Sequence, residues 1–208
     1  MRPMLLNSRR LALIAGALAA TTALSACAPL LLGGAAVGGA LMYTDRRTSG
    51  TQVEDETIEL KAINRLKERL GDRGHINVTS YNRLVLISGE ASSEADRATA
   101  EQVVRGIENV NSVVNELAVI GSSSMTARSN DAILTSKVKA TFLDTKDVQA
   151  NAIKVVTERG TVFLMGRVTE REATRAADVA RSVSGVQKVV RVFEILTEAE
   201  LQGLKPKS

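Results

Sequence analysis

The stretch GTVFLMGRVTEREATRAADVARSVSGVQKVVRVFEIL, residues 160–196, contains the pattern that decides the fold. Its first part is apolar up to Gly166, which predicts a strand. The segment EREATRAADVARSV, residues 170–183, predicts a helix, and the β-branched KVVRVFEIL, residues 188–196, predicts a closing strand. This part of the chain is therefore expected to form a strand, a helix and a second strand.

The same order of elements occurs earlier, in RLVLISGEASSEADRATAEQVVRGIENVNSVVNELAVI, residues 83–120. Gly89 aligns with Gly166, and SVVNELAVI at 112–120 aligns with KVVRVFEIL. These matches define an internal repeat of about 76 residues. We interpret the two aligned glycines as turn or strand-end residues, because no glycine-rich phosphate-binding fingerprint surrounds either of them.

A helix and a hairpin precede this pattern in each copy. Residues 55–70 and 131–143 carry apolar side chains at helical spacing, and each segment begins with an aspartate suited to a helix cap or first turn. The segments INVTS and AIKVVT then alternate apolar and polar residues, which predicts the first strand of a hairpin. The two predicted apolar helix faces consist of Ile58, Ala62, Leu66 and Leu70, and of Leu134, Val138 and Phe142.

Each copy is thus predicted to contain a helix, two strands, a helix and a third strand. The expected fold class is α+β, with two tandem α-β-β-α-β domains, each a small three-stranded sheet packed on two helices. A unit of about 65 to 70 residues buries only about 60% of the surface of its unfolded chain. We therefore expect each domain to be modestly stable and to depend on its twin.

The first 26 residues have the layout of a secretory signal. Arginines 2, 9 and 10 precede the apolar run LALIAGALAATTAL, whose 14 residues fall short of the about 20 that span a bilayer. The segment LSAC, residues 24–27, resembles the lipobox of bacterial lipoproteins. That resemblance implies that Cys27 becomes the acylated first residue of the mature protein, and Ala28 after it favours sorting to the outer membrane. The alternative is an incidental cysteine in an ordinary signal peptide.

The polar, turn-rich YTDRRTSGTQVED, residues 43–55, is expected to link this anchor to the folded part, and GSSSMTARS, residues 121–129, to join the two copies. The expected organisation is a lipoprotein signal peptide at 1–26, an acylated anchor and linker at 27–54, a first domain at 55–120, a linker at 121–129, a second domain at 130–197 and a polar tail at 198–208.

The repeated pattern resembles the BON domain over nearly all of residues 55–196, and with the lipobox the whole chain resembles dual BON-domain outer membrane lipoproteins. The resemblance implies a non-enzymatic protein, anchored in the outer membrane and facing the periplasm. It also implies a second domain that binds anionic phospholipid, gathering at division sites, and support of outer membrane integrity and protein assembly.

Composition argues against other classes of function. Aromatic residues make up 2% of the chain, so single-stranded nucleic acid would find no stacking platform, and the three signal arginines account for most of the excess of 27 basic over 23 acidic side chains. One histidine, His75, and one cysteine cannot form a zinc site or a nucleophile with its base, so no catalytic residue, metal or cofactor is expected. We interpret His75 as a solvated strand-end residue.

Lipid binding has a local basis in the predicted helix at 131–143. If its apolar face packs on the core, Ile133, Lys137 and Ala140 form a neighbouring stripe, with Lys139 nearby. An apolar residue beside lysines suits an anionic membrane surface. The family resemblance implies that an aromatic at the position of Ile133 can insert between lipids, and isoleucine would insert less deeply. The alternative is that Ile133 lies in the core and the lysines form a solvated face.

These residues lead to two hypotheses of different classes. In the first, the helix binds phosphatidylglycerol or cardiolipin and concentrates the lipoprotein where such lipids collect. In the second, one copy docks on an envelope protein, such as the outer membrane assembly machinery, and lipid contact is incidental.

Overall fold

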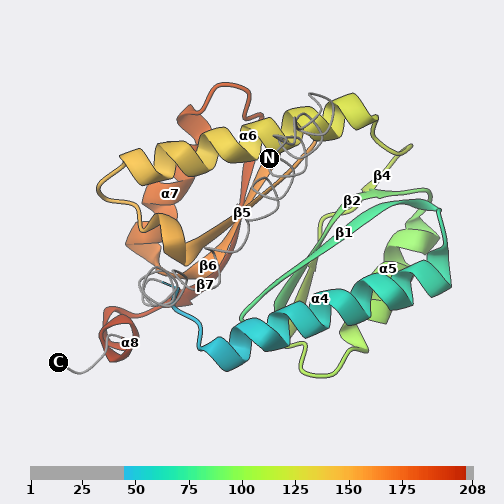
Figure 1. The fold of residues 1–208 in the computed structure, drawn as a ribbon, viewed down its shortest axis with the longest axis horizontal. Helices are drawn as coiled ribbons and strands as arrows, with labels where there is room; N and C mark the ends of the chain where they lie inside the picture. Colours follow the sequence, from blue (N-terminus) through green and yellow to red (C-terminus); the bar gives the residue numbers. More distant parts are fainter. Residues whose placement is uncertain (1–44, 205–208) are drawn as a thin grey trace, which may run out of the picture. The chain divides into compact units, whose positions relative to one another are not determined.

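The computed structural model describes residues 45–204, so the predicted signal peptide and Cys27 lie outside the described range. The described residues form one structural unit, and both repeats belong to it (Figure 1). Within the described residues, no helix combines the length and the apolar character that crossing a membrane requires.

The first repeat has the predicted order of elements. It consists of α4 (Ser49–Leu70), β1 (Gly74–Tyr81), β2 (Leu84–Ala91), α5 (Glu94–Arg105), β3 (Ser112–Asn115) and β4 (Ala118–Val119). In its sheet, β1 pairs antiparallel with β2, whereas β3 and β4 both pair parallel with β2. The single closing strand that we predicted is therefore broken. At the break, Asn115 Oδ1 accepts the backbone N–H of Leu117, whose side chain is buried in the core.

The second repeat consists of α6 (Met125–Asp144), a short 3₁₀ turn (Ala150–Ala152), β5 (Ile153–Glu158), β6 (Thr161–Thr169), α7 (Glu170–Ser182) and β7 (Lys188–Leu196), followed by α8 (Glu198–Gly203). Its sheet has the order β5-β6-β7, with β5 antiparallel and β7 parallel to β6. The predicted α+β class, with two tandem α-β-β-α-β units, is confirmed.

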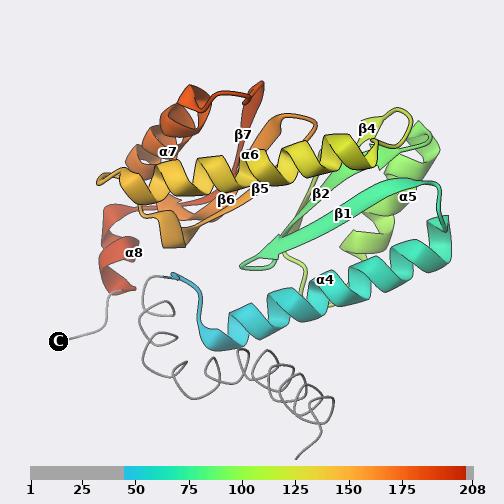
Figure 2. The ribbon, with the colours of Figure 1, turned by 45° about the horizontal axis from the view of Figure 1, so that its top comes forward.

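One face of each sheet packs on the two helices of its own repeat. All seven residues of the predicted apolar helix faces are buried in α4 and α6. In the second repeat Val138 and Phe142 meet Val155, Val162 and Leu164 of the sheet and the alanines of α7. Because α7 presents small side chains to this core, it can lie close to the sheet and beside α6 (Figure 2).

The other face of each sheet packs on the sheet of the twin repeat. Leu86 of β2 lies in one buried cluster with Phe163 and Met165 of β6, joined by Tyr81 and Val192. The unit is therefore layered as helices, sheet, sheet and helices (Figure 1). Each repeat therefore covers the second face of the other repeat's sheet. This agrees with the expectation that each small domain depends on its twin for stability.

The helices begin earlier than predicted. The side chain of Thr48 caps α4 and that of Ser124 caps α6, each by accepting a backbone N–H three residues later. Helix α4 therefore occupies part of the expected linker at 27–54, and α6 begins inside the expected linker at 121–129. The expected polar tail also starts as a helix, α8, with a capping box between Thr197 and Glu200.

Gly89 and Gly166 lie inside strands β2 and β6, so our interpretation of them as turn or strand-end residues is wrong. A Cβ at Gly89 would collide with the carbonyl oxygen of His75, and one at Gly166 with that of Ala152. Gly89 also has a φ of +105°, which side chains rarely tolerate. Close approach of the neighbouring backbone requires glycine at both positions, from β1 at Gly89 and from the 3₁₀ turn before β5 at Gly166.

Candidate functional site

The predicted lipid-binding residues lie on the solvent side of α6. Ile133 is 55% exposed, and Lys137, Lys139 and Ala140 are also exposed. The interpretation in which Ile133 belongs to the core is therefore wrong. The core positions of the helix are filled by Leu134, Val138 and Phe142 instead, together with Asp131.

The exposed face of α6 is broader than the predicted stripe. Met125 is 73% exposed and Leu143 is 70% exposed, at the two ends of the helix. With about 100° of rotation per residue, these two share a line with exposed Ala132 and Ser136, next to the line of Ile133 and Ala140. The spacing of seven, four and seven residues from Met125 to Leu143 is a signal in the sequence that our prediction did not use.

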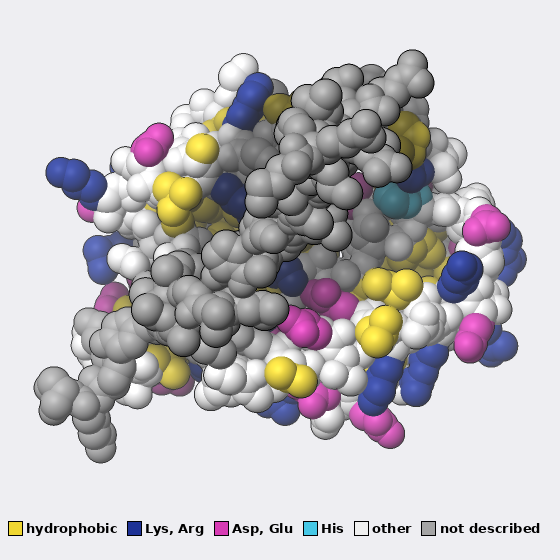
Figure 3. Space-filling model, in the orientation of Figure 1, with side chains coloured by type: hydrophobic (Ala, Val, Ile, Leu, Met, Phe, Trp, Pro, Cys, Tyr) yellow, Lys and Arg dark blue, Asp and Glu magenta, His cyan; other side chains and the backbone are white. Residues whose placement is uncertain are grey.

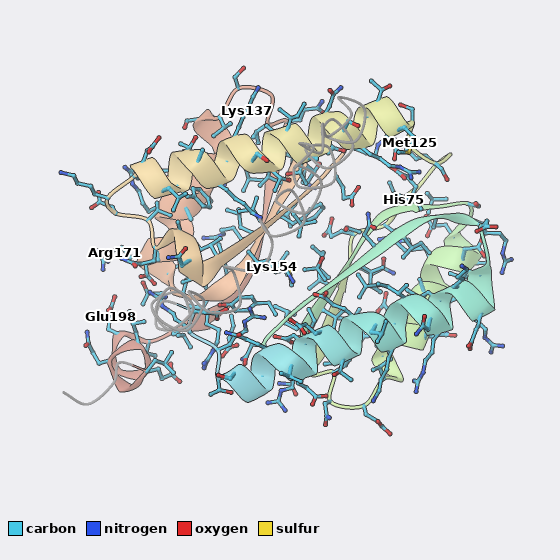
Figure 4. The ribbon with its side chains drawn as sticks, in the orientation of Figure 1. His75, Met125, Lys137, Lys154, Arg171 and Glu198 are labelled. Atoms are coloured by element: carbon cyan, nitrogen blue, oxygen red, sulfur yellow. The ribbon has the colours of Figure 1, made fainter. Side chains whose placement is uncertain are left out.

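The lysines lie on opposite borders of this face. Helical spacing places Lys137 on the side of Ile133 and Lys139 on the other side, one turn before Leu143. We call Met125, Ala132, Ile133, Lys137, Lys139, Ala140 and Leu143 together the α6 outer face. Figure 4 labels Lys137 and Met125 on this helix, and Figure 3 shows hydrophobic and basic side chains interspersed over its visible part.

The charge of the α6 outer face is positive along most of its length. Between the caps, α6 has two acidic residues, and one of them, Asp131, is buried. The other, Asp144, is the last residue of the helix. An apolar strip with a lysine on each border is the arrangement found on helices that lie in the interface of an anionic bilayer.

Asp131 fixes α6 to the hairpin of its own repeat. Its carboxylate accepts the backbone N–H groups of Arg159 and Gly160 at 2.8 and 2.9 Å. This places the β5–β6 turn beside the part of α6 that carries Ile133 and Lys137. We had expected Asp131 at a helix cap or first turn, and it lies in the second turn because the helix begins at Met125.

Three of the predicted site residues line two separate hollows in the surface. Ile133 and Lys137 line one of about 500 Å³, together with Asn130, Arg159 and Gln187. Lys139 lines another of about 330 Å³, which also contains Leu143, Tyr81 and Lys154. The structure thus brings Ile133 and Lys137 together at one cavity and places Lys139 at a different one.

His75 lies near the start of its strand, as expected, but it is not fully solvated. It is the second residue of β1 and is partly buried, with its ring Nε2 3.2 Å from Asn77 Nδ2 (Figure 4). Burial and the positive charge of Arg128 lower its pKa. Among residues 45–204, no group of three or more His, Cys, Asp or Glu side chains is placed to hold a metal ion.

The segment that precedes α4 binds both repeats. Arg46 forms two hydrogen bonds of 2.7 and 2.8 Å to the carboxylate of Glu172 in α7. Arg47 pairs with Asp55 of α4 at 2.8 Å and stacks over the ring of Tyr81 at 4.1 Å from its centroid. The chain that comes from the predicted anchor is therefore attached to the folded unit from residue 45 on.

Comparison with known proteins identifies the family. The family model for the BON domain matches residues 54–121 and 130–197. The chain is 40% identical over 190 residues to the outer membrane lipoprotein DolP of Haemophilus influenzae, which covers 90% of this chain and 96% of that protein.

Two further relatives share a smaller part of the chain. One is a 21 kDa hemolysin of Actinobacillus pleuropneumoniae, 36% identical over 72% of this chain and 78% of that protein. The other is the osmotically inducible protein Y of Escherichia coli, 31% identical over 67% of this chain and 72% of that protein.

The likeness to DolP over nearly the whole chain confirms the expected lipid-anchored location at the outer membrane. Acylation of Cys27 itself stays a prediction. Two matched domains, together with 40% identity over 90% of the chain, show that the chain belongs to the BON-domain family, as a dual BON-domain outer membrane lipoprotein of the DolP type.

Proposed function

We propose that this protein binds anionic phospholipid, phosphatidylglycerol or cardiolipin, through the α6 outer face. In this proposal it supports the integrity of the outer membrane at division sites, and its role is binding and not catalysis. The observation that carries the proposal is that Ile133 is 55% exposed next to exposed Lys137, while other residues of α6 fill the positions that pack on the core.

The physical basis is a weak surface interaction added to an existing anchor. Each lysine near an anionic surface contributes about 1 kcal/mol. Burying a large aliphatic side chain in the acyl boundary adds about 1.5 to 3 kcal/mol, and Ile133, Leu143 and Met125 are available for it. These contributions give a free protein only reversible binding, which liposomes can measure, and they orient and concentrate a protein that acyl chains already keep at the bilayer.

The test is sedimentation of residues 43–208 with liposomes of neutral or anionic composition. The variant Lys137→Glu with Lys139→Glu, and separately Ile133→Asp with Lys137→Glu, should weaken binding to anionic vesicles by at least about 10- to 30-fold. The matched control is Arg171→Glu with Arg175→Glu, which reverses two exposed charges on α7 of the same repeat (Figure 4). Equal binding to neutral and anionic vesicles, or an equal loss in the control, would contradict the proposal.

The same variants separate lipid binding from docking on an envelope protein. If cells that carry them show normal localisation and outer membrane integrity although liposome binding is lost, an envelope protein and not phospholipid is the functional partner. Loss of localisation together with liposome binding supports the lipid proposal.

A further inference from the structure

The first repeat carries its own exposed stripe, on α4. Leu60 is 62% exposed and Ile63 is 50% exposed, and exposed Glu56 and Lys67 lie one turn outside them. The spacing of four, three and four residues keeps all four side chains on one side of the helix. We call them the α4 stripe. Figure 3 shows hydrophobic side chains over α4, with acidic and basic ones beside them.

The charge of the α4 stripe differs from that of the α6 outer face. Its apolar pair has a carboxylate at one end and an ammonium group at the other, so the stripe has no net charge. Along its whole length α4 exposes the carboxylates of Glu56 and Glu68 and the basic groups of Arg65, Lys67 and Arg69, an excess of only one basic group. An anionic bilayer favours a helix with an excess of lysine and arginine on its polar face. The α4 stripe therefore suits a protein surface of complementary charge better than a membrane.

The pattern of the α4 stripe is complementary to itself. Read from Glu56 to Lys67, it is acidic, aliphatic, aliphatic and basic, and the spacing is the same from either end. When two such helices lie antiparallel across a two-fold axis between residues 61 and 62, Leu60 of one copy faces Ile63 of the other. The same axis places Glu56 of each copy opposite Lys67 of the other, so both ends of the contact are paired. A two-fold contact of this kind uses one patch on both subunits.

We propose that the α4 stripe is the contact surface of a homodimer, in which the α4 helices of two copies pack antiparallel in this register. Helix α4 is a rigid platform for such a contact. Its buried face packs in the core of the first repeat. Glu59 also holds the helix to the second repeat, because its carboxylate accepts a hydrogen bond from Lys154 Nζ at 2.9 Å. A contact made by so few side chains is weak in solution, and anchoring of both copies in one membrane raises their effective concentration.

The test uses the full-length lipoprotein in the bacterial envelope. Asn64→Cys places a thiol beside the α4 stripe and leaves its four residues intact, and a short bis-maleimide should then yield crosslinked dimers. Gln102→Cys, at an exposed position of α5, is the matched control, and the parent chain with Cys27 as its only cysteine gives the background. A dimer yield for Asn64→Cys no higher than for Gln102→Cys would overturn the proposal.

Charge reversal in the Asn64→Cys chain then tests the register. Glu56→Lys alone, or Lys67→Glu alone, places like charges opposite each other twice and should lower the dimer yield at least fivefold. Combining the two should restore the yield, because each pair is re-formed with the charges exchanged. Failure of the combined variant to restore it would refute antiparallel self-pairing. The alternative occupant of the stripe is the apolar segment 28–42 of the same chain, which contains no charged side chain. Binding of that segment would give no crosslinked dimer, and the charge-reversal variants would not change the yield.

Discussion

Asp55 and Asp131 perform the same task in the two repeats: each carboxylate, buried on the first helix of its repeat, accepts two backbone N–H groups of the β-hairpin turn. Asp55 accepts from Asn82 and Arg83 at 2.8 Å each, as Asp131 does from Arg159 and Gly160. The turn residues Asn82, Arg83 and Arg159 have positive φ values, and the bonds to aspartate help to hold this unfavoured backbone.

Replacing Asp131 should therefore destabilise the second repeat. Asp131→Ala leaves two N–H groups without an acceptor and should lower the free energy of unfolding by about 2 to 4 kcal/mol, and Asp131→Asn, which keeps one acceptor oxygen, should cost less. Urea unfolding of residues 43–208 measures both. Asp144→Ala, at the exposed end of the same helix, is the control and should have almost no effect. An Asp131→Ala protein as stable as the control would show that the bonds to the turn contribute little.

A methyl group at either in-strand glycine should collide with the adjoining backbone. Gly89→Ala and Gly166→Ala should each destabilise the protein by about 2 to 4 kcal/mol. Gly89→Ala should have the larger effect of the two, because its φ of +105° adds backbone strain. The measurement is the midpoint of urea unfolding. Gly121→Ala serves as the control, since a Cβ at Gly121 meets no atom within 4 Å. Equal midpoints for all three variants would contradict the close approach of the strands.

The bond between Arg46 and Glu172 should stabilise the protein in a pH-dependent way. Burial alone would raise the pKa of Glu172, but hydrogen bonds from Arg46 and from the Thr169 backbone outweigh it and lower that pKa. A lowered pKa means that the contribution is present above the ordinary carboxyl value and is lost as the pH falls through the lowered one.

The variant Glu172→Gln tests this bond, because glutamine can still accept the N–H of Thr169 at the start of α7. It should cost about 1.5 to 3 kcal/mol at pH 7 and less at pH 3. Unfolding at both pH values measures the difference. Glu170→Gln, which removes the more exposed pair with Arg191, should cost less than about 1 kcal/mol. A cost for Glu172→Gln that does not shrink at pH 3 would contradict the assignment.

Glu158 should show the opposite dependence on pH. Burial between the two repeats raises its pKa, and the nearby carboxylates of Glu90 and Asp131 raise it further. Because the folded protein holds this proton more tightly, the contribution is present below the ordinary carboxyl pKa and is lost as the pH rises through the raised one. Glu158→Gln should therefore raise the melting temperature at pH 7 and leave it nearly unchanged at pH 4. Parallel melting profiles of the wild type and the variant would refute this.

Much of the fold was predictable because it depends on local periodicity. The repeat, the order of elements and the buried faces of α4 and α6 follow from the spacing of apolar residues along a helix or strand. The helix starts were not predictable in this way. Asp55 and Asp131 belong to a residue type that caps helices, and nothing local distinguishes such a cap from a buried aspartate that binds a turn from the adjoining hairpin.

The candidate site was predictable in part. Helical spacing placed Ile133, Lys137 and Ala140 on one stripe, and their exposure agrees with it. Whether Ile133 belongs to the core depends on how wide a face of α6 the sheet and α7 cover, and this width is a property of the assembled repeat. The separation of Lys139 from Lys137 by two hollows depends in the same way on neighbours from β5 and from the first repeat.

The sequence by itself determined two α-β-β-α-β units, the positions of their cores and the class of protein, because periodicity and short motifs are local properties of a chain. Only the tertiary structure decided what covers the second face of each sheet. The run TVFLM, residues 161–165, is apolar on both faces of its strand, so it requires a packing partner on each side. The sequence does not show which element supplies either partner. Leu86, Phe163 and Met165 pack together because the twin sheet supplies that second partner, across about 80 residues of sequence.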